Sequence, residues 1–248
     1  MKRLGGRFIV FDGGEGCGKS TQARLLREKL EAAGQAVTLV RDPGSTAIGE
    51  KIRQILLNPD HSEMSMRCEM LLYMAARAQM MHEHILPALA RGDVVLCDRF
   101  VSSTLAYQLG GDGVTDAEIR AVAEIALRGR WPDLTLIFDM PVAASRERVR
   151  AKFEHRSQTL FGEQVEIVKD RIESRPEEYH LRVRENYLAQ ARREPHRYRV
   201  IDGARSIEQV HADVVAAVEQ MDWEAATGKQ AGSTGSRARR TRKQRAQR

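Results

Sequence analysis

The sequence predicts a three-layer α/β fold in which a five-stranded parallel β-sheet lies between layers of helices. Three observations lead to this prediction. A glycine-rich turn, residues 13–20, follows an apolar run and leads into a helical pattern. Short apolar runs rich in β-branched residues then alternate with helical patterns along the chain. The 248 residues, 42% hydrophobic and 30% charged, are enough for one domain with a buried core.

The glycine-rich turn predicts a phosphate-binding loop. Its residues match the pattern G-x-x-x-x-G-K-[ST], and the expected strand 7–12 and a helix starting near Lys19 provide the right context. Glycines let backbone N–H groups surround an anion, and the helix N-terminus adds its dipole. Lys19 can reach β- and γ-phosphates, and the Ser20 hydroxyl can bind Mg²⁺. The alternative is a strand–helix turn that binds nothing.

We therefore expect the chain to bind a nucleoside triphosphate through Gly13, Gly14, Glu15, Gly16, Cys17, Gly18, Lys19, Ser20 and Thr21. Cys17 has two interpretations. A thiolate at a helix N-terminus is stabilised and oxidisable, whereas a buried small residue is inert. We favour the buried small residue.

The remaining elements follow in order. Further strands are expected over 37–40, 93–97, 134–139 and 198–201. Helical patterns cover 48–56, 63–90, a segment starting after Thr115, an arginine-rich segment around 146–150, 179–188 and 206–223. The methionines of the pattern over 63–90 are expected to fill the core.

Polar residues follow two of the expected strands. The turn-rich loop 41–46 comes after the second strand, at the edge where open parallel sheets bind ligands. Asp98 ends the third strand and can hold Mg²⁺ directly or through water. Arg99 beside it would place a guanidinium group near phosphates, and an ion pair between these two residues is the alternative. Tyr73 and Arg77 share one helix face.

The charge of the chain is concentrated at its C-terminal end. Of 40 basic and 34 acidic residues, eight basic and one acidic lie in 224–248, which leaves 32 and 33 in the rest. This segment has no apolar residue beyond alanine, so we expect a disordered basic tail after a domain over 1–223. A solvated tail is favoured over one that binds nucleic acid weakly.

Composition also bears on location. The three cysteines have no C-x-x-C spacing, so neither disulfides nor a zinc site are expected. The sequence contains no run of eighteen apolar residues, so no membrane span is expected. Its N-terminus lacks the pattern of a signal peptide. A cytoplasmic protein is the simplest expectation.

Several ordered motifs together resemble the thymidylate kinase family of P-loop nucleoside monophosphate kinases. The resemblance covers about residues 7–221. Its most specific parts are Tyr73-x-x-x-Arg77-Ala-Gln combined with Asp98-Arg99-Phe100 through Ala106-Tyr107-Gln108. The phosphate-binding loop, the loop 41–44 and the segment Asp170-Arg171-Ile172-Glu173 complete it. It implies the P-loop nucleoside monophosphate kinase fold and transfer of the γ-phosphoryl of ATP to dTMP, giving dTDP and ADP for dTTP synthesis.

The resemblance also implies roles in binding the acceptor base. Tyr73 would stack on thymine, and Arg77 would donate to its O4 atom. Cytosine carries an amino group there, which a donor-only guanidinium group rejects. Thr104 and Gln108 match positions of further base contacts. Asp42 and Pro43 belong to the same site, although the family usually has Glu in place of Asp42.

Other implied roles concern the sugar and the phosphates. Tyr107 matches a ring that favours deoxyribose, and Arg99 matches the arginine that grips the acceptor phosphate. Glu15 matches an acidic residue that positions the acceptor. With Lys19 and Mg²⁺ on Ser20 and Asp98, these residues would serve phosphoryl transfer.

No arginine lies inside the phosphate-binding loop, so the chain resembles the class whose catalytic arginine comes from a mobile lid, here about residues 150–172. Arg171 is the main candidate, with Arg148, Arg150 or Arg156 as others. A homodimer is implied by the resemblance alone. Two alternatives stay open: a P-loop kinase for another nucleotide or deoxynucleoside, and a nucleotide-dependent ATPase associated with DNA.

Overall fold

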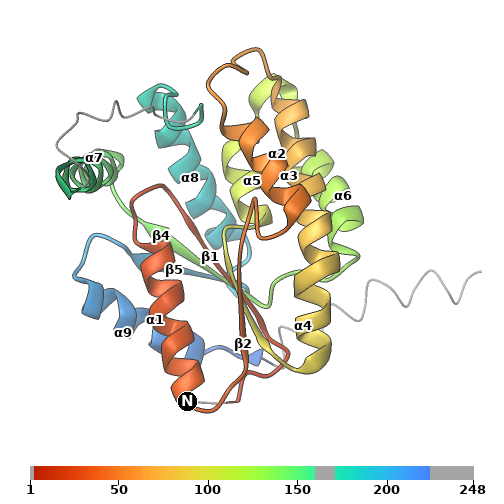
Figure 1. Cartoon of the computed structure of the whole chain (residues 1–248), viewed down its shortest axis with the longest axis vertical. Coiled ribbons are helices and arrows are strands. Elements are labelled where there is room, and N and C mark those ends of the chain that lie inside the picture. Colours follow the sequence, from red (N-terminus) through yellow and green to blue (C-terminus); the bar gives the residue numbers. More distant parts are fainter. Residues whose placement is uncertain (1–2, 160–170, 224–248) are drawn as a thin grey trace, which may run out of the picture.

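The computed structural model describes residues 3–159 and 171–223, with only the backbone of 152–159. A five-stranded parallel sheet forms its centre (Figure 1). The strands are β1 (Phe8–Gly13), β2 (Val37–Arg41), β3 (Val94–Asp98), β4 (Leu134–Asp139) and β5 (Tyr198–Asp202). All five predicted strands are therefore confirmed, and their ends differ from the predicted ends by one residue at most.

The sheet has the order β2-β3-β1-β4-β5, so β1 is central. Every residue of β1 is buried, because it is covered on both faces and flanked by two strands. Its side chains alternate between the faces: Ile9 and Phe11 pack on one side, Phe8 and Val10 on the other. The carboxyl ends of all five strands meet at one edge, where the phosphate-binding loop begins.

Two helices cover one face of the sheet. They are α1 (Lys19–Ala32) and α9 (Ile207–Glu219), and they pack on each other and on the strands. Leu26 and Leu30 of α1 and Val214 of α9 are fully buried in this layer. The spacing of these apolar residues matches one helix face, which explains the helical pattern in the sequence.

Helices α5 (Val101–Tyr107) and α8 (Glu177–Arg193) cover the other face, together with α3 (Met66–Met80), the π-helical turn η1 (Met81–Ile85) and α4 (Leu86–Arg91). The pattern predicted as one helix over 63–90 is thus divided by a π-helical turn and begins at Met66. Four of its methionines are buried, as predicted, at positions 70, 74, 80 and 81. Helices α2 (Ala47–Leu57) and α6 (Asp116–Leu127) pack against α3, and η2 is a short 3₁₀ turn (Gly111–Gly113).

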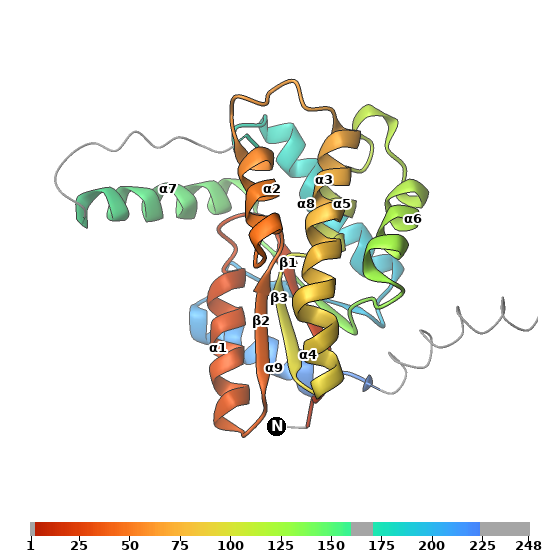
Figure 2. The ribbon, with the colours of Figure 1, turned by 45° about the vertical axis from the view of Figure 1, so that its right-hand side comes forward.

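Helix α7 (Val142–Thr159) follows β4 and extends away from the rest of the molecule (Figure 2). The sequence predicted an arginine-rich helix here. Most of the predicted lid, residues 150–172, and all of the predicted tail, residues 224–248, lie outside the described residues or in the part described by backbone alone. Within the described ranges no helix combines the length and apolar character of a membrane span.

Glu118 joins α6 to α3. It caps α6 by a reciprocal pair of bonds with Thr115, and its carboxylate accepts a bond from Arg67 of α3 at 2.8 Å. The bonds from Arg67 and Thr115 lower the pKa of Glu118 to about 2, against an ordinary value of 4.5. A carboxyl group whose pKa is lowered by folding stabilises the fold above its unfolded pKa and stops doing so as pH falls through the folded value.

We therefore expect Glu118→Gln to be less stable than the unchanged protein at neutral pH, with a difference that shrinks between pH 4.5 and about 2. Urea midpoints measured over this range check it. Arg67→Gln removes the same ion pair from α3 and should show a smaller difference with the same pH dependence. A difference that stays constant down to the lowest pH would contradict the assignment.

Candidate active site

The phosphate-binding loop joins β1 to α1, as predicted. Gly13 has a φ of +137°, and a Cβ there would lie 2.4 Å from the Phe138 carbonyl oxygen of β4. Gly18 precedes α1 with a φ of +95°, in the left-handed region that glycine adopts freely. A side chain at position 13 would clash with β4, and the backbone conformation at position 18 favours glycine.

The side chains of the loop turn back onto its backbone. Lys19 is buried and its Nζ atom donates to the Gly14 carbonyl oxygen at 2.5 Å. Cys17 is 1% exposed and its Sγ atom donates to the same oxygen at 2.9 Å. This burial supports the interpretation of Cys17 as a small packed residue.

Ser20 and Asp98 come together at the start of α1. The Ser20 hydroxyl donates to the Asp98 carboxylate at 2.5 Å, although the two residues lie far apart in the sequence. Hydroxyl and carboxylate oxygens are ligands that suit Mg²⁺, which needs few protein ligands when phosphates supply others. The residues therefore fit a magnesium ion. The alternative ion pair between Asp98 and Arg99 is not among the described contacts, and Arg99 points to other partners.

The N-terminal turns of α7 pack on the phosphate-binding loop. The Ser145 hydroxyl donates to the Glu15 carbonyl oxygen. Gly16, with a φ of +66°, lies so close that a Cβ there would be 2.9 Å from both the Ser145 carbonyl oxygen and Val149. The loop and the first two turns of α7 therefore pack as one unit.

A pocket of about 110 Å³ opens beside the loop, and we call it the smaller pocket. It brings together nine residues that the sequence predicted for the site: Glu15, Asp42, Pro43, Tyr73, Arg77, Arg99, Thr104, Tyr107 and Gln108. They come from the loop, the end of β2, α3, the end of β3 and α5. Four more lining residues were not predicted: Arg53, Leu57, Ser103 and Ile172.

The sequence contains only weak signals for the four unpredicted residues. Arg53 and Leu57 are spaced i, i+4 on α2, which places them on one face, and Arg53 donates to the Pro43 carbonyl oxygen at 3.2 Å. Ser103 stands one residue before Thr104, and Ile172 lies within the segment that carries the family resemblance. Only the shared helix face of Arg53 and Leu57 could have been used.

Arg77 is held by a buried ion pair. Its Nε atom donates to Asp42 at 2.7 Å, and its Nη2 atom donates to Asp42 and to the Phe100 carbonyl oxygen. The Nη1 atom has weaker partners, the Met74 sulfur and the Thr104 hydroxyl at 3.3 Å. Nη1 is thus the donor that an oxygen in the pocket can recruit.

Asp42, the other member of the pair, has one oxygen that accepts no hydrogen bond from the described residues. Burial raises the pKa of Asp42, and Arg77 opposes this shift. The Oδ1 atom of Asp42 is buried with no hydrogen-bond partner among the described residues. Because Asp42 lines the smaller pocket, this oxygen is an acceptor close to any bound molecule.

The carboxylate of Asp12 is a buried centre that the sequence did not reveal as a site residue. Asp12 lies one residue before the end of β1 and is fully buried. It accepts hydrogen bonds from the hydroxyls of Ser102, Ser103 and Tyr187 at 2.5, 2.6 and 2.6 Å. The Phe100 N–H also donates to it. An acid at the end of a buried strand was the signal that identified Asp98, and it applied equally here.

Arg99 lies next to this centre in a strained conformation. Its φ of +68° is uncommon for a residue with a Cβ and persists only where surrounding contacts impose it. Its Nη1 atom donates to the Gly13 carbonyl oxygen at 3.1 Å and to Ser103 at 3.2 Å, and lies 3.9 Å from Asp12. The guanidinium group is thus fixed between the loop and the smaller pocket.

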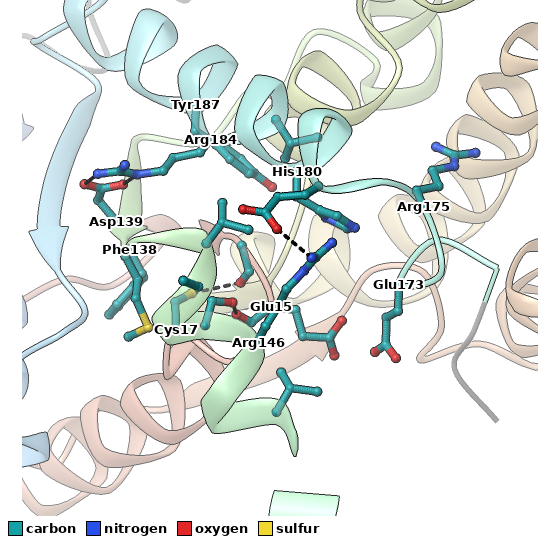
Figure 3. Close-up of a pocket in the computed structure, with 18 of the residues that line it drawn as sticks. Glu15, Cys17, Phe138, Asp139, Arg146, Glu173, Arg175, His180, Arg184 and Tyr187 are labelled. Carbon is teal, nitrogen blue, oxygen red and sulfur yellow. Dashed lines mark hydrogen bonds and ion pairs between the residues drawn. The ribbon is translucent and has the colours of Figure 1, made fainter. Parts of the chain in front are cut away.

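A larger pocket of about 650 Å³ lies between the loop, α7 and α8 (Figure 3). Glu15 and Cys17 line it from the loop, and His180 and Tyr187 from α8. Arginines reach it from both helices: Arg146, Arg150 and Arg184. Glu15 and Tyr107 line both pockets, so the two pockets adjoin.

Arg171 is not brought to the phosphate-binding loop. Its Nη2 atom donates to the buried carboxylate of Glu69, and its Nε atom donates to the Leu56 carbonyl oxygen at 3.1 Å. Only 7% of Arg171 is exposed. Arg148 donates instead to the carbonyl oxygens of Gly203 and Ala204, and the side chain of Arg156 lies outside the described residues.

The Asp12 centre gives a stability prediction. Asp12→Asn replaces two acceptor oxygens with one oxygen and a donor NH₂ group, which then faces hydroxyl and N–H donors. We expect this to lower the free energy of unfolding by about 3 kcal/mol, measured by urea unfolding. Asp60→Asn, at an exposed position, is the matched control and should leave stability unchanged. Equal stability of the two variants would contradict a structural role for Asp12.

Comparison with known proteins agrees with this geometry. The family model described as thymidylate kinase matches residues 11–214. The chain is 47% identical to a thymidylate kinase of Pelotomaculum thermopropionicum, over 87% of this chain and 94% of that protein. It is 41% identical to one of Alcanivorax borkumensis, over 88% and 98%. A crystal structure of thymidylate kinase from Ehrlichia chaffeensis superposes with a TM-score of 0.65 at 28% identity, over 86% of this chain and 98% of that one. The chain belongs to the thymidylate kinase family.

Proposed function

We propose that this protein transfers the γ-phosphoryl group of ATP to dTMP, giving dTDP and ADP as a step in dTTP synthesis. The observation that carries the proposal is the smaller pocket. It gathers nine residues from five separate segments beside a phosphate-binding loop. Membership of the thymidylate kinase family supports the same reaction.

We propose that the smaller pocket holds the acceptor. The ring of Tyr73 would stack on thymine, and the Nη1 atom of Arg77 would donate to O4 in exchange for its weaker partners. Thr104 and Gln108, both 1% exposed, would complete the contacts with the base. Tyr107 would lie against the deoxyribose. Since Arg77, Thr104 and Gln108 are buried, a base with the wrong pattern of donors leaves their polar atoms unpaired.

The donor would bind on the phosphate-binding loop. The backbone N–H groups of residues 13–18 and the N-terminus of α1 would hold its phosphates, and Lys19 would exchange the Gly14 oxygen for them. Ser20 and Asp98 would hold Mg²⁺. When bound, this ion would neutralise charge on the phosphates.

Phosphoryl transfer needs alignment and charge neutralisation more than covalent chemistry. Arg99 is placed between the loop and the smaller pocket, so it would hold the acceptor phosphate in line with the donor. Glu15 lines both pockets and would orient the acceptor. Of the predicted candidates on α7 we favour Arg150 to meet the transferred group, because it lines the larger pocket together with Glu15, whereas Arg148 donates to the carbonyl oxygens of Gly203 and Ala204.

Other features belong to the same proposal. Residues 1–223 would form the kinase domain, with the lid at about 150–172 and the basic tail outside the mechanism. A homodimer is supported by large apolar side chains exposed on α2 and α3, namely Ile48, Ile55 and Leu71. A cytoplasmic location suits an enzyme of nucleotide synthesis.

A panel of acceptors tests the proposed reaction. With ATP and Mg²⁺, we expect dTMP to give the highest kcat/KM among dTMP, dUMP, dCMP, dGMP and the unphosphorylated nucleosides, because only thymine satisfies both shape and hydrogen bonding. A preference for another acceptor would identify a different kinase. ATP hydrolysis stimulated by DNA without an acceptor would identify an ATPase. Lys19→Met should abolish turnover with every acceptor.

Arg171→Ala separates two possible roles of this arginine. A residue that meets charge developing during transfer affects kcat more than the KM for dTMP. Loss of the buried pair with Glu69 should instead lower Tm by on the order of 10 °C and raise the KM, because Ile172 lines the smaller pocket. From the burial of Arg171 we expect the second result.

Arg192→Ala, which removes an exposed ion pair of α8, is the control and should change neither quantity. A selective loss of kcat at unchanged Tm would support the catalytic role that the sequence predicted for Arg171.

A further inference from the structure

Glu69 is a buried carboxylate that the proposed mechanism does not use. It lies on α3, one turn before Tyr73, and is fully buried. It does not line the smaller pocket. A buried carboxylate is costly unless it is paired and hydrogen-bonded, so its partners indicate what it does.

The two oxygens of Glu69 have different partners. The Oε2 atom accepts from the guanidinium groups of Arg171 and Arg175, the latter at 2.7 Å. The Oε1 atom accepts from the Nε2 atom of Gln108 at 2.7 Å. One carboxylate thus joins Arg171, at the end of the predicted lid, and Arg175, just beyond it, to an amide that lines the smaller pocket.

The two arginines also hold the carboxylate in place. The Arg171 N–H donates to the Leu57 carbonyl oxygen at 3.2 Å, and its side chain donates to Leu56. Arg175 donates to the hydroxyl of Tyr179, which in turn donates to the Tyr107 carbonyl oxygen at 2.8 Å. Both arginines bind Oε2, so Oε1 is left to accept from Gln108.

This arrangement settles the orientation of the Gln108 amide. An ionised carboxylate has acceptors only, so it selects the NH₂ end of a neighbouring amide and rejects the oxygen end. The polar atom that Gln108 can then offer to the smaller pocket is its carbonyl oxygen.

We propose that Glu69 is a positioning residue for base selection, which holds the Gln108 amide with its carbonyl oxygen toward the acceptor base. This inference rests on the proposed function. The pocket then offers an acceptor from Gln108 next to donors from Arg77. Thymine has the matching N3–H donor and O4 acceptor, whereas cytosine has an acceptor at N3 and an amino donor at C4. The carboxylate of Glu69 therefore decides selectivity without touching the nucleotide.

Glu69→Gln tests this in the full-length protein. The two arginines would take the amide oxygen of the new side chain, so its NH₂ group would face Gln108. Gln108 would then turn its oxygen to position 69 and its NH₂ group to the base, which suits cytosine. We expect the ratio of kcat/KM for dTMP to that for dCMP to fall by about tenfold or more.

Glu118→Gln is the matched control, because Glu118 also pairs with an arginine but lies outside both pockets. It should keep the ratio of the unchanged protein. In a Gln108→Leu background, Glu69→Gln should change the ratio by less than about twofold, since no amide is left to orient. An unchanged ratio in Glu69→Gln alone, or an equal fall in the Gln108→Leu background, would overturn the proposal.

A further variant covers the case in which Glu69→Gln does not fold. Gln108→Asn keeps Glu69 and both arginine pairs but withdraws the amide by one methylene, so it should also lower the ratio by about tenfold. Full selectivity in this variant would overturn the proposal. If the unchanged protein does not prefer dTMP, the proposed function fails. If it does and the variants keep the preference, only the role of Glu69 fails.

Discussion

The buried carboxylate of Asp12 is the interaction on which the rest of the site depends. It lies where the central strand ends and the phosphate-binding loop begins, and it accepts from α5 through Ser102 and Ser103 and from α8 through Tyr187. The loop and α5 both contribute to the smaller pocket, and α8 forms a wall of the larger one. A single set of bonds therefore fixes the distance between the place that suits phosphates and the place that suits a base.

Two further polar groups of the site are also paired before any ligand arrives. Arg77 is bound to Asp42, and Gln108 is bound to Glu69, each at 2.7 Å. Pre-paired groups lose little conformational freedom on binding, which favours selective recognition over adaptable recognition. The cost is that each buried charge depends on its partner, so a change at Asp42 also affects Arg77, and a change at Glu69 affects Gln108 although Glu69 does not line the smaller pocket.

Much of this could be predicted from the sequence, for identifiable reasons. The alternation of strands and helices and the spacing around Lys19 are local patterns, so the sheet and the loop were readable. Nine residues of the smaller pocket were predicted through the family resemblance. The strained backbone of Arg99 and the pairing of Glu69 with Arg171 were not, because the first depends on surrounding contacts and the second joins residues 102 positions apart. For this reason the sequence predicted Arg171 as the catalytic arginine of the lid and gave no sign of its buried ion pair with Glu69.

The close packing of Gly16 beneath Ser145 and Val149 has a consequence for motion. Because a Cβ at Gly16 would lie 2.9 Å from both the Ser145 carbonyl oxygen and Val149, the first two turns of α7 have little room to move toward the loop. Any closing movement of this helix must pivot beyond Val149. The phosphate-binding loop packs on the fixed end of α7. Binding of the donor's phosphates to this loop would therefore act directly at the pivot of the helix.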